Sequence, residues 1–267
     1  PTQTINELAI ALSYVIDSEG SQNNFHGWRV AVIAERIAGK MLDPNKRKEV
    51  FYAALLHDVG GVELSRHIIN YLKRSDKASL NLLLSHPIIG SQMISNIPRI
   101  GPVGRLIIDH HEWINGLGYP AAKVQKSIPL GAQIIRIADT IDILMRTGYL
   151  NFDRLKKKLS QNIGKEFTRE IFDTACSAIK TKNLFNQIKD LKNMPRIFDA
   201  AKKRIGPIHI PLRIDAIGTA LEIVAQIIDM KHPYTSGHSL RVSRYALACA
   251  LTLKFSHDDI TFLRWAG

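Results

Sequence analysis

Apolar residues recur along this chain with the spacing of amphipathic helices, three or four positions apart. One such run consists of Ile5, Leu8, Ala9, Leu12 and Ile16. A second run consists of Val30, Ile33, Ala34, Ile37 and Ala38. The same periodicity predicts further helices over Glu49–His57, Leu130–Arg146 and Arg169–Ala178. Because no series of alternating strands bounded by hairpin turns is found, the sequence predicts an all-α fold.

A segment near the start of the chain returns near its end at a constant spacing of 212 residues. Val15–Ala34 aligns with Ile227–Ala246, so that the His-x-x-Arg-Val motif at His26 falls on the same motif at His238. Two long amphipathic helices can give some matches by chance, but a shared His-x-x-Arg-Val motif is harder to obtain that way. The sequence therefore predicts an internal repeat.

This repeat divides the chain into two parts. We expect a first domain over residues 1–205, a linker over 206–212 marked by Gly206, Pro207 and Pro211, and the opening of an incomplete second copy over 213–267. The two helices of the second copy carry apolar stripes: Ile214, Ile217, Leu221, Val224 and Ile228, then Val242, Tyr245, Ala246, Cys249 and Leu253. Two-fold contacts are the commonest assembly of soluble chains, so we expect these stripes to pair in a homodimer.

The composition is ordinary for a globular protein, with 45% apolar and 22% charged residues. No apolar run reaches about 18 residues, so no membrane segment is expected. Cys176 and Cys249 lie far apart and neither belongs to a CxxC motif, which indicates a reducing, cytoplasmic location. Eight of the twelve net positive charges fall between Asn151 and Ile205. Without a nucleic-acid-binding motif beside them, they are interpreted as solvated helix faces, and no nucleic-acid partner is expected.

Histidines and aspartates occupy positions where buried ligands are expected. The pair His57-Asp58 closes the apolar helix Phe51–Leu56, which places an imidazole and a carboxylate at the edge of a core. Polar groups there must be paired or must coordinate a metal. The other candidates are His26, His86 beside Pro87 at an expected helix start, the tandem pair His110-His111, and Asp139 in the helix predicted over Leu130–Arg146.

These candidates offer only nitrogen and oxygen donors. Imidazole and carboxylate without thiolate suit iron, manganese, nickel or zinc rather than an iron–sulfur cluster. The donors exceed the needs of a single ion, which favours two metals. Two metals about 3.5–4 Å apart can stabilise both the attacking and the leaving oxygen of a phosphoryl transfer.

Two motifs of the chain are distinctive, the pair His57-Asp58 and the run His110–Pro120, which reads HHEWINGLGYP. Together they resemble the HD-GYP family of metal-dependent phosphohydrolases, whose signature is HHExxDGxGYP. Four shorter elements agree with this family: His-Pro-x-x-Gly at His86–Gly90, Ile-Pro-Leu at Ile128–Leu130, Ile-Ala-Asp-x-x-Asp at Ile137–Asp142, and Gly-x-x-Phe at Gly164–Phe167. The resemblance covers Ile5 to about Ile205 and restarts at Pro233–Val242.

The resemblance implies an HD-domain helical bundle around a two-metal site that hydrolyses cyclic di-GMP or a related phosphoester. By position, it implies that the metal ligands are His57, Asp58, His86, His110, His111 and Asp139, with Asp58 as the bridging, catalytic carboxylate. His26 matches an additional ligand of members with three metals, but the carboxylate four residues earlier is Gln22 here. Two transition metals, iron or manganese, are therefore expected. The residues implied to meet substrate are Gly118, Tyr119, Pro120 and Arg146.

The chain departs from the family mainly where substrate is bound. The lysine of the family's HDxGK motif is Gly61, and the family's Arg-Pro-Tyr element is Gly148-Tyr149-Leu150. The aspartate before the Gly-x-Gly-Tyr-Pro turn is Asn115. Losing a cation that anchors a phosphate removes a charge-assisted hydrogen bond. Activity on cyclic di-GMP is therefore expected to be weak or absent.

Three functions remain open from the sequence. The leading one is a metal-dependent phosphodiesterase, supported by the complete ligand set. The second is a domain that keeps its metals without turnover, as a nucleotide sensor or as a module that binds a signalling protein through the Gly-Tyr-Pro loop. The third, a basic nucleic-acid-binding protein, rests on charge alone and leaves the histidines unexplained. Asp142 is expected beside the ligands or at the surface, and His238 is expected to lack partners.

Overall fold

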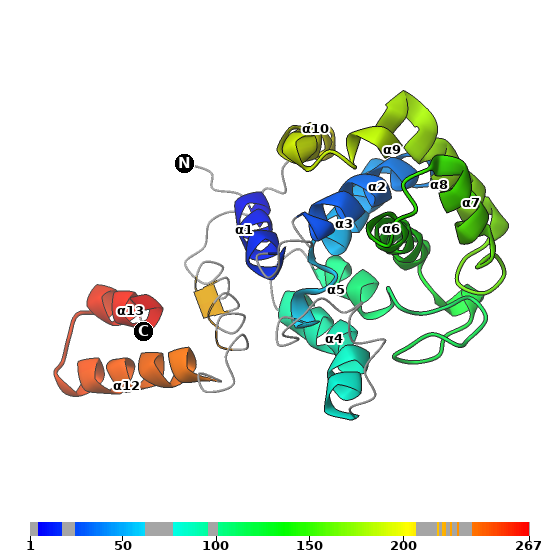
Figure 1. Ribbon diagram of the computed structural model, residues 1–267. Helices are drawn as coiled ribbons and strands as arrows, with labels where there is room; N and C mark the ends of the chain where they lie inside the picture. The colour runs from blue at the N-terminus through cyan, green and yellow to red at the C-terminus, as the bar shows by residue number, and fades with distance from the viewer. Residues whose placement is uncertain are drawn as a thin grey trace.

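The computed structural model of the chain describes residues 5–17, 25–61, 77–95, 101–206 and 237–266, and positions 218, 221, 222, 225 and 229. In these residues it forms helices and no strand apart from two isolated bridges, which confirms the all-α prediction (Figure 1). Among them, no helix combines the length and hydropathy needed to cross a bilayer. The longer helices are α1 (Ile5–Asp17), α2 (His26–Met41), α3 (Pro44–Leu56), α4 (Lys77–Ser95), α5 (Gly101–Ile108), α6 (Leu130–Arg146), α7 (Phe152–Ser160), α8 (Arg169–Lys180), α9 (Leu184–Gln187), α10 (Met194–Ile205), α12 (His238–Thr252) and α13 (His257–Ala266). Short 3-10 turns are η1 (Val59–Gly61), η3 (Gln125–Ser127), η4 (Thr181–Asn183) and η5 (Leu191–Asn193).

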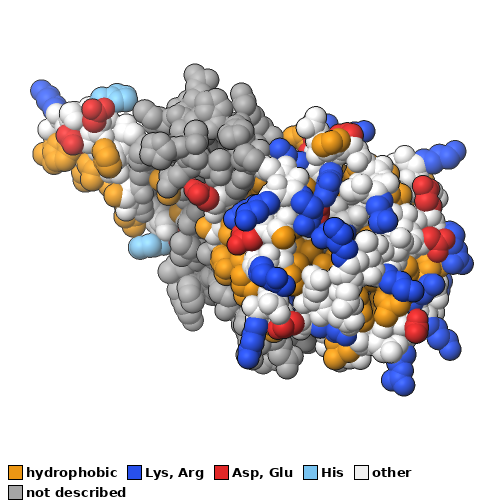
Figure 2. All heavy atoms as spheres, turned by 90° about the horizontal axis from the view of Figure 1, so that it is seen from above, with side chains coloured by type: hydrophobic (Ala, Val, Ile, Leu, Met, Phe, Trp, Pro, Cys, Tyr) orange, Lys and Arg blue, Asp and Glu red, His pale blue; other side chains and the backbone are white. Residues whose placement is uncertain are grey.

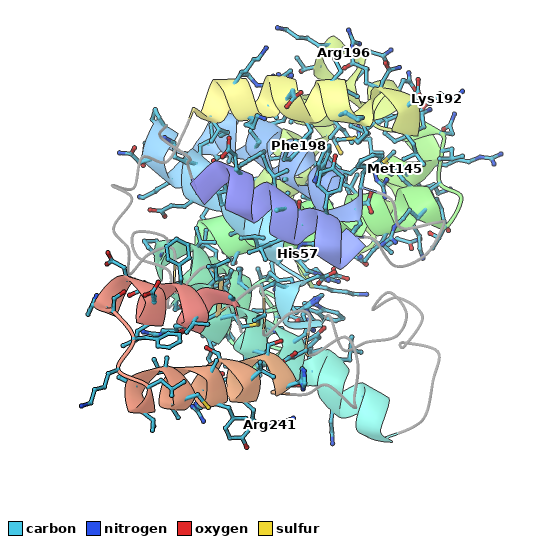
Figure 3. The ribbon with its side chains drawn as sticks, turned by 90° about the vertical axis from the view of Figure 1, so that its left-hand side faces the viewer. His57, Met145, Lys192, Arg196, Phe198 and Arg241 are labelled. Carbon is cyan, nitrogen blue, oxygen red and sulfur yellow. The ribbon has the colours of Figure 1, made fainter. Side chains whose placement is uncertain are left out.

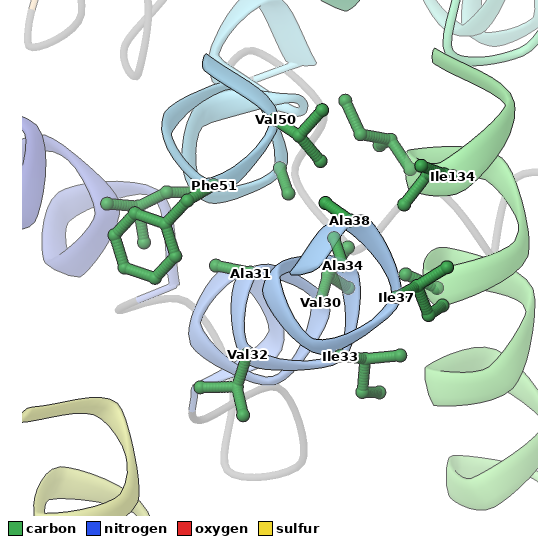
Figure 4. Close-up of a cluster of buried hydrophobic side chains, with 14 of the residues drawn as sticks. Val30, Ala31, Val32, Ile33, Ala34, Ile37, Ala38, Val50, Phe51 and Ile134 are labelled. Carbon is green, nitrogen blue, oxygen red and sulfur yellow. The ribbon is translucent and has the colours of Figure 1, made fainter. Parts of the chain in front are cut away.

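Helix α2 forms the centre of the bundle. Helices α3, α6, α8 and α10 pack around it, and its residues Val30–Ala34 are fully buried (Figures 1 and 4). A helix buried on every side differs from the single apolar stripe that the sequence predicts, because Ala31 and Val32 also face neighbouring helices. Each large aliphatic side chain buried in this way stabilises the fold by about 1.5–3 kcal/mol.

Helix α3 begins earlier than its apolar periodicity indicates. The sequence predicts a helix from Glu49, whereas α3 starts at Pro44. The carboxylate of Asp43 accepts hydrogen bonds from the backbone N–H groups of Asn45 and Lys46, at 3.0 and 3.1 Å, and Pro44 fits the first helical position. The first turn is polar and solvated, so it adds no apolar signal. The helix ends at Leu56, directly before the His57-Asp58 pair.

The start of helix α4 also differs from the prediction. The sequence predicts a helix start at His86-Pro87, but both residues lie inside α4, which runs from Lys77 to Ser95. Proline usually disrupts a helix interior because it lacks an N–H and crowds the preceding turn. Here the helix continues, and His86 uses the carbonyl group that the proline leaves without its regular helical donor. By contrast, the predicted bounds of α6 agree with the structure, and α8 extends the predicted helix to Lys180.

A buried carboxylate joins three helices away from the histidines. Glu35 of α2 is fully buried and pairs with Arg47 of α3 and with Arg204 of α10, whose Nη2 lies 2.7 Å from Oε2. Close by, Phe198 of α10 points into the bundle (Figure 3) and stacks on Trp28 at 4.1 Å between ring centroids. These contacts fasten α10 to α2 and thereby close the domain.

Helices α12 and α13 pack on each other beside the bundle (Figure 1). Helix α2 starts at His26 after Phe25 at φ 69°, and α12 starts at His238 after Gly237 at φ 67°, again 212 positions apart. Although Val30 is fully buried, the corresponding Val242 is 38% exposed. The predicted linker residues Pro207 and Pro211, and the helix positions Ile214, Ile217, Val224 and Ile228, lie outside the described residues. The domain division stays a prediction.

The basic segment forms the helices α7 to α10. Lys156, Lys157 and Lys158 are all exposed on α7, in agreement with a solvated helix face. On the face shown in Figure 2, Lys and Arg side chains are scattered over the bundle and do not gather into one patch.

Candidate metal centre

Buried imidazoles and carboxylates from five parts of the bundle meet at the end of α3. They are His26 at the start of α2, His57 and Asp58 after α3, His86 in α4, His110 and His111 after α5, and Asp139 in α6. All of the predicted ligand positions are thus brought together. Two groups of these side chains have donor atoms close enough to hold an ion: Asp58 with His86, His110 and His111, and Asp58 with His26 and His57.

Two glycines allow α4 to approach Asp58. A Cβ atom on Gly60, in the turn after Asp58, would lie 2.2 Å from the carbonyl oxygen of His86 and 2.4 Å from the nitrogen of Gly90. No side chain fits between the turn and the helix, so the two backbones touch. This contact explains why glycines follow both His57-Asp58 and His86-Pro87, and it places His86 beside Asp58.

The carboxylate of Asp58 lies between the two groups of imidazoles. Its Oδ2 is 3.5 Å from Nε2 of His26 and 3.5 Å from Nε2 of His57. Its Oδ1 is 3.5 Å from Nε2 of His86 and 3.9 Å from Nε2 of His110. Each oxygen therefore faces a different pair of imidazoles. A carboxylate in this position can bridge two ions.

Backbone carbonyl groups fix the orientation of three imidazoles. In each case Nδ1 donates to the carbonyl three residues earlier: His57 to Ala54 at 2.8 Å, His86 to Leu83 at 2.6 Å, and His110 to Ile107 at 2.6 Å. The proton on Nδ1 leaves Nε2 as a bare acceptor that points into the centre. Such a hydrogen bond on the outer nitrogen is the usual support of a metal-bound histidine.

Pro87 makes the hydrogen bond from Nδ1 of His86 to the backbone possible. In a regular helix the N–H of residue 87 would donate to the carbonyl of Leu83. Pro87 has no N–H, so this carbonyl is available to the imidazole of His86. The proline that obscures the helix in the sequence thus serves the site.

The donor set fits a pair of cations. Nε2 of His26 lies 3.3 Å from Nε2 of His57, and Nε2 of His86 lies 3.3 Å from Nε2 of His110. Since Nδ1 of His86 and Nδ1 of His110 each donate to a backbone carbonyl, two lone pairs face each other between these two rings. A buried arrangement of this kind is favourable only with positive charge between the nitrogens. The chemistry of the donors, nitrogen with carboxylate oxygen, suits transition metals.

Electrostatics favour the ligating states of His110 and Asp58, whereas His26 would have to lose a proton on ligation. Burial, together with the charges of His57 and His86, holds the pKa of His110 well below its usual value. Burial would raise the pKa of Asp58, but the charge of His57 and the hydrogen bond from His26 lower it well below its usual value. For His26, burial and Arg146 lower the pKa, yet the hydrogen bonds to Asp142 and Asp58 raise it to about 9. Ionised carboxylate and neutral imidazole are the forms that bind metal.

Asp142 supports His26 from behind. Its Oδ2 accepts from Nδ1 of His26 at 2.7 Å, and its carboxylate also pairs with Arg29. Arg146, a predicted substrate contact, turns toward the same carboxylate, with Nε 3.0 Å from Oδ2. Asp142 is fully buried, beside the ligands rather than at the surface. Gln22, the position that would complete a third metal site, lies outside the described residues.

The loop that contains Gly118, Tyr119 and Pro120 is held against the histidines. Glu112, fully buried, accepts backbone hydrogen bonds from Ala121 at 2.7 Å and from Lys123 at 2.8 Å. A Cβ on Gly118 would lie 2.2 Å from the nitrogen of Trp113, so only glycine fits there. The ring of Tyr119 then stacks on His111, with 4.7 Å between centroids. The predicted substrate residues Gly118 and Tyr119 thus lie at the centre.

Sequence reasoning missed two further features of the site. One is the role of Glu112, which ties the loop and binds no other described group in the centre. The other is a buried ion pair between Arg136 and Glu166, with Nη2 of Arg136 2.7 Å from Oε2. The signals existed, since Glu112 belongs to the HHE motif and Glu166 to the Gly-x-x-Phe element. Arg136 is 30 residues from Glu166, and the partners of Glu112 are backbone N–H groups of an irregular loop, so neither contact could be deduced.

The sequence of the chain is similar to one protein family and to several curated phosphodiesterases. Residues 11–165 match the HD domain family. The cyclic di-GMP phosphodiesterase response regulator RpfG of Xanthomonas campestris is 31% identical over 146 residues, which cover 54% of this chain and 38% of the relative. The 3'3'-cGAMP-specific phosphodiesterase 3 of Vibrio cholerae is 28% identical over 138 residues, covering 51% of this chain and 30% of the relative. The chain spans less than half the length of these curated relatives.

Solved structures share the fold. The crystal structure of a cyclic GMP-AMP specific phosphodiesterase of V. cholerae superposes with a TM-score of 0.73 at 21% identity, covering 100% of this chain and 70% of the other. Bd1817, an HD-GYP-type protein of Bdellovibrio bacteriovorus, has a TM-score of 0.50 at 25% identity, covering 59% of this chain and 52% of the other.

Proposed function

The chain belongs to the HD domain family, and from this membership we propose that it is a metal-dependent phosphodiesterase acting on a cyclic dinucleotide or a related phosphoester. One observation carries the proposal: the two oxygens of Asp58 face two separate groups of imidazoles. The phosphodiesterase names of the relatives support this reaction class. Cyclic di-GMP and 3'3'-cGAMP are the substrates those names suggest for testing.

In this proposal the two metals supply Lewis-acid stabilisation of the charge that develops on the phosphate oxygens. His26, His57 and Asp139 would hold the first, and His86, His110 and His111 the second. Asp58, whose two oxygens face the two groups, would be shared by both. Tyr119, stacked on His111, borders the centre and can contact a bound nucleotide. Iron or manganese is the proposed metal, and both are among the metals that nitrogen and oxygen donors suit.

A second candidate function is a nucleotide sensor without turnover. It is favoured by Gly61 and Gly148, which stand where the family carries cations that meet phosphate. Arg146 does not replace these cations, because it pairs with Asp142. The same metal centre can then bind a phosphoester without hydrolysing it efficiently.

One experiment distinguishes the two functions. Protein loaded with iron or with manganese is assayed on cyclic di-GMP and 3'3'-cGAMP, with metal content measured on the same sample. Turnover by metal-loaded protein, abolished by Asp58→Ala, supports the phosphodiesterase. Binding without turnover supports the sensor, and a gain of activity in Gly61→Lys would then identify the missing cation as the cause. Loaded protein that neither binds nor cleaves either nucleotide would contradict both functions.

Exposed apolar side chains on two surfaces support the proposed binding of other protein chains. On the loop beside the centre, Leu117 is 74% exposed and Val124 is 55% exposed, which suits docking of a signalling protein. On α12 Tyr245 is 68% exposed, and Leu253, directly after this helix, is 66% exposed, which supports a homodimer through residues 213–267. We propose the cytoplasm as its location. Light scattering of the chain, with and without residues after Ile210, tests the dimer. A monomer in both cases would rule it out.

A further inference from the structure

A buried arginine touches candidate ligands of both metal positions. Arg136 lies on α6, one helical turn before Asp139, and only 12% of its side chain is exposed. Its Nη1 is 3.1 Å from Nδ1 of His111 and 3.6 Å from Oδ2 of Asp139. His111 belongs to the group around Oδ1 of Asp58, whereas Asp139 lies near His26, on the other side. Arg136 therefore contacts one candidate ligand on each side of the centre.

The guanidinium is itself held in place by Glu166. Both Nε and Nη2 of Arg136 lie close to Oε2 of Glu166, at 2.8 and 2.7 Å. Thr140 also reaches this oxygen, at 3.4 Å. Glu166 is in the loop before α8, and the carbonyl of its neighbour Lys165 accepts from the backbone N–H of Asn115 at 3.1 Å. The carboxylate is thus anchored to the same loop that carries Tyr119.

We propose that the Arg136–Glu166 pair is a positioning device that orients Asp139 for metal binding. This inference rests on the proposed metal centre and assigns roles to two residues outside the ligand set. Oδ1 of Asp139 faces His26 at 3.7 Å, while Oδ2 faces Arg136. A contact on one oxygen directs the other oxygen of the carboxylate toward the metal position. Outer contacts of this kind set the orientation of metal-bound carboxylates.

Charge explains why the arginine needs its partner. A guanidinium never loses its proton in a protein, so Arg136 alone would repel cations bound a few ångströms away. Glu166 neutralises this charge from the side opposite to the centre. With the pair intact, Arg136 can fix Asp139 without a net positive charge next to the metals.

The contact with His111 defines a second consequence. Arg136 can only donate, so Nδ1 of His111 accepts in this structure, and Nε2 of His111 has no hydrogen-bond partner in the described part of the chain. Ligation through Nε2 requires a proton on Nδ1. Arg136 must then direct Nη1 to Oδ2 of Asp139, which is only slightly farther away. A metal held by Nε2 of His111 would thereby favour the contact of Arg136 with Asp139.

The test compares Mn²⁺ binding by chelator competition in the wild type, Glu166→Gln, Arg136→Met and Arg136→Lys. The matched control is Glu35→Gln, which breaks a buried Glu–Arg pair of the same kind away from the centre. Circular dichroism melts in chelator show whether each variant is folded. We expect Glu166→Gln and Arg136→Met to weaken Mn²⁺ binding on the order of tenfold. Arg136→Lys keeps the positive charge but loses the planar guanidinium with its several donors. Its Mn²⁺ affinity should therefore lie between those of these two variants and that of the wild type.

The double variant Arg136→Met with Glu166→Met removes the pair as a unit. Because the two residues act through one contact, we expect its loss of affinity to be no larger than that of either single variant. Wild-type affinity in the folded single variants, or a loss equal to that of Glu35→Gln, would overturn the proposed role. Multiplied losses in the double variant would also overturn it. A wild type that binds no Mn²⁺ would overturn the metal centre as well, so the two failures are distinguishable.

Discussion

Nδ1 of His26 lies 2.7 Å from Oδ2 of Asp142 inside the bundle, although 116 residues separate them in the chain. The carboxylate also pairs with Arg29, a buried guanidinium. Asp142 thus links the orientation of an imidazole in the centre to the packing of α2 on α6. Asp142 lies one turn after Asp139 in the Ile-Ala-Asp-x-x-Asp element. From there it both orients His26 and joins α2 to α6.

The first prediction concerns this contact. We expect Asp142→Asn to destabilise the protein by about 3–5 kcal/mol, because it leaves Arg29 buried without its countercharge. Urea unfolding followed by circular dichroism measures this change. A loss below 1 kcal/mol would show that Arg29 finds another partner and that Asp142 is not essential to the packing of α2.

A second prediction follows from Pro87. In Pro87→Ala, the new N–H can donate to the carbonyl of Leu83 and displace Nδ1 of His86. We expect thermal stability without metal to stay equal or to rise, since proline disfavours a helix interior. Metal affinity is expected to fall. Melting in chelator and Mn²⁺ titration of the same preparation separate the two effects, and unchanged affinity would contradict the role assigned to Pro87.

The third prediction concerns Gly118. A Cβ at this position meets the backbone of His111 and Trp113, so Gly118→Ala must displace the loop. We expect loss of the stacking of Tyr119 on His111, and weaker nucleotide binding, with both metals retained. Ala122→Gly, in the same loop at φ 52°, is the control and should be tolerated. Equal nucleotide affinity in Gly118→Ala and the wild type would exclude a role of this loop in binding.

A fourth prediction uses acid stability. Burial would raise the pKa of Glu35, but hydrogen bonds from Arg204 and Arg47 lower it below its usual value of 4.5. A depressed pKa stabilises the folded state above pH 4.5, and this stability is lost as the pH falls through the folded pKa. The difference in unfolding free energy between the wild type and Glu35→Gln should therefore shrink from neutral pH to about pH 3. A constant difference would mean that the ion pair is not the cause.

Periodicity and motifs predict much of this molecule, and the remainder has identifiable physical causes. The bounds of α6 follow from its apolar face, whereas α3 and α4 differ because a polar first turn and an internal proline carry no helical apolar signal. The sequence names the candidate ligands through short motifs. The ion pair of Arg146 with Asp142, four residues apart on α6, could have been predicted from its spacing, but the family resemblance assigned Arg146 to substrate instead.

The contacts around the candidate ligands could not be predicted from the sequence for a related reason. Glu112 and Glu166 act on groups that become neighbours only when the loops fold, and neither has a periodicity of its own. The close approach of Gly60 and Gly90 likewise needs two backbones in contact. Glycines in a motif indicate that such a contact exists, but not where its partner lies.

The fifth prediction tests the centre itself through Asp58, the carboxylate shared by both groups of imidazoles. Metal per chain is measured by mass spectrometry after loading with manganese or iron and removal of free metal. We predict two ions per chain in the wild type and in Glu35→Gln, and none in Asp58→Ala, because each position loses the same carboxylate. Two ions retained by folded Asp58→Ala, or one ion or fewer in the wild type, would contradict a metal pair bridged by Asp58.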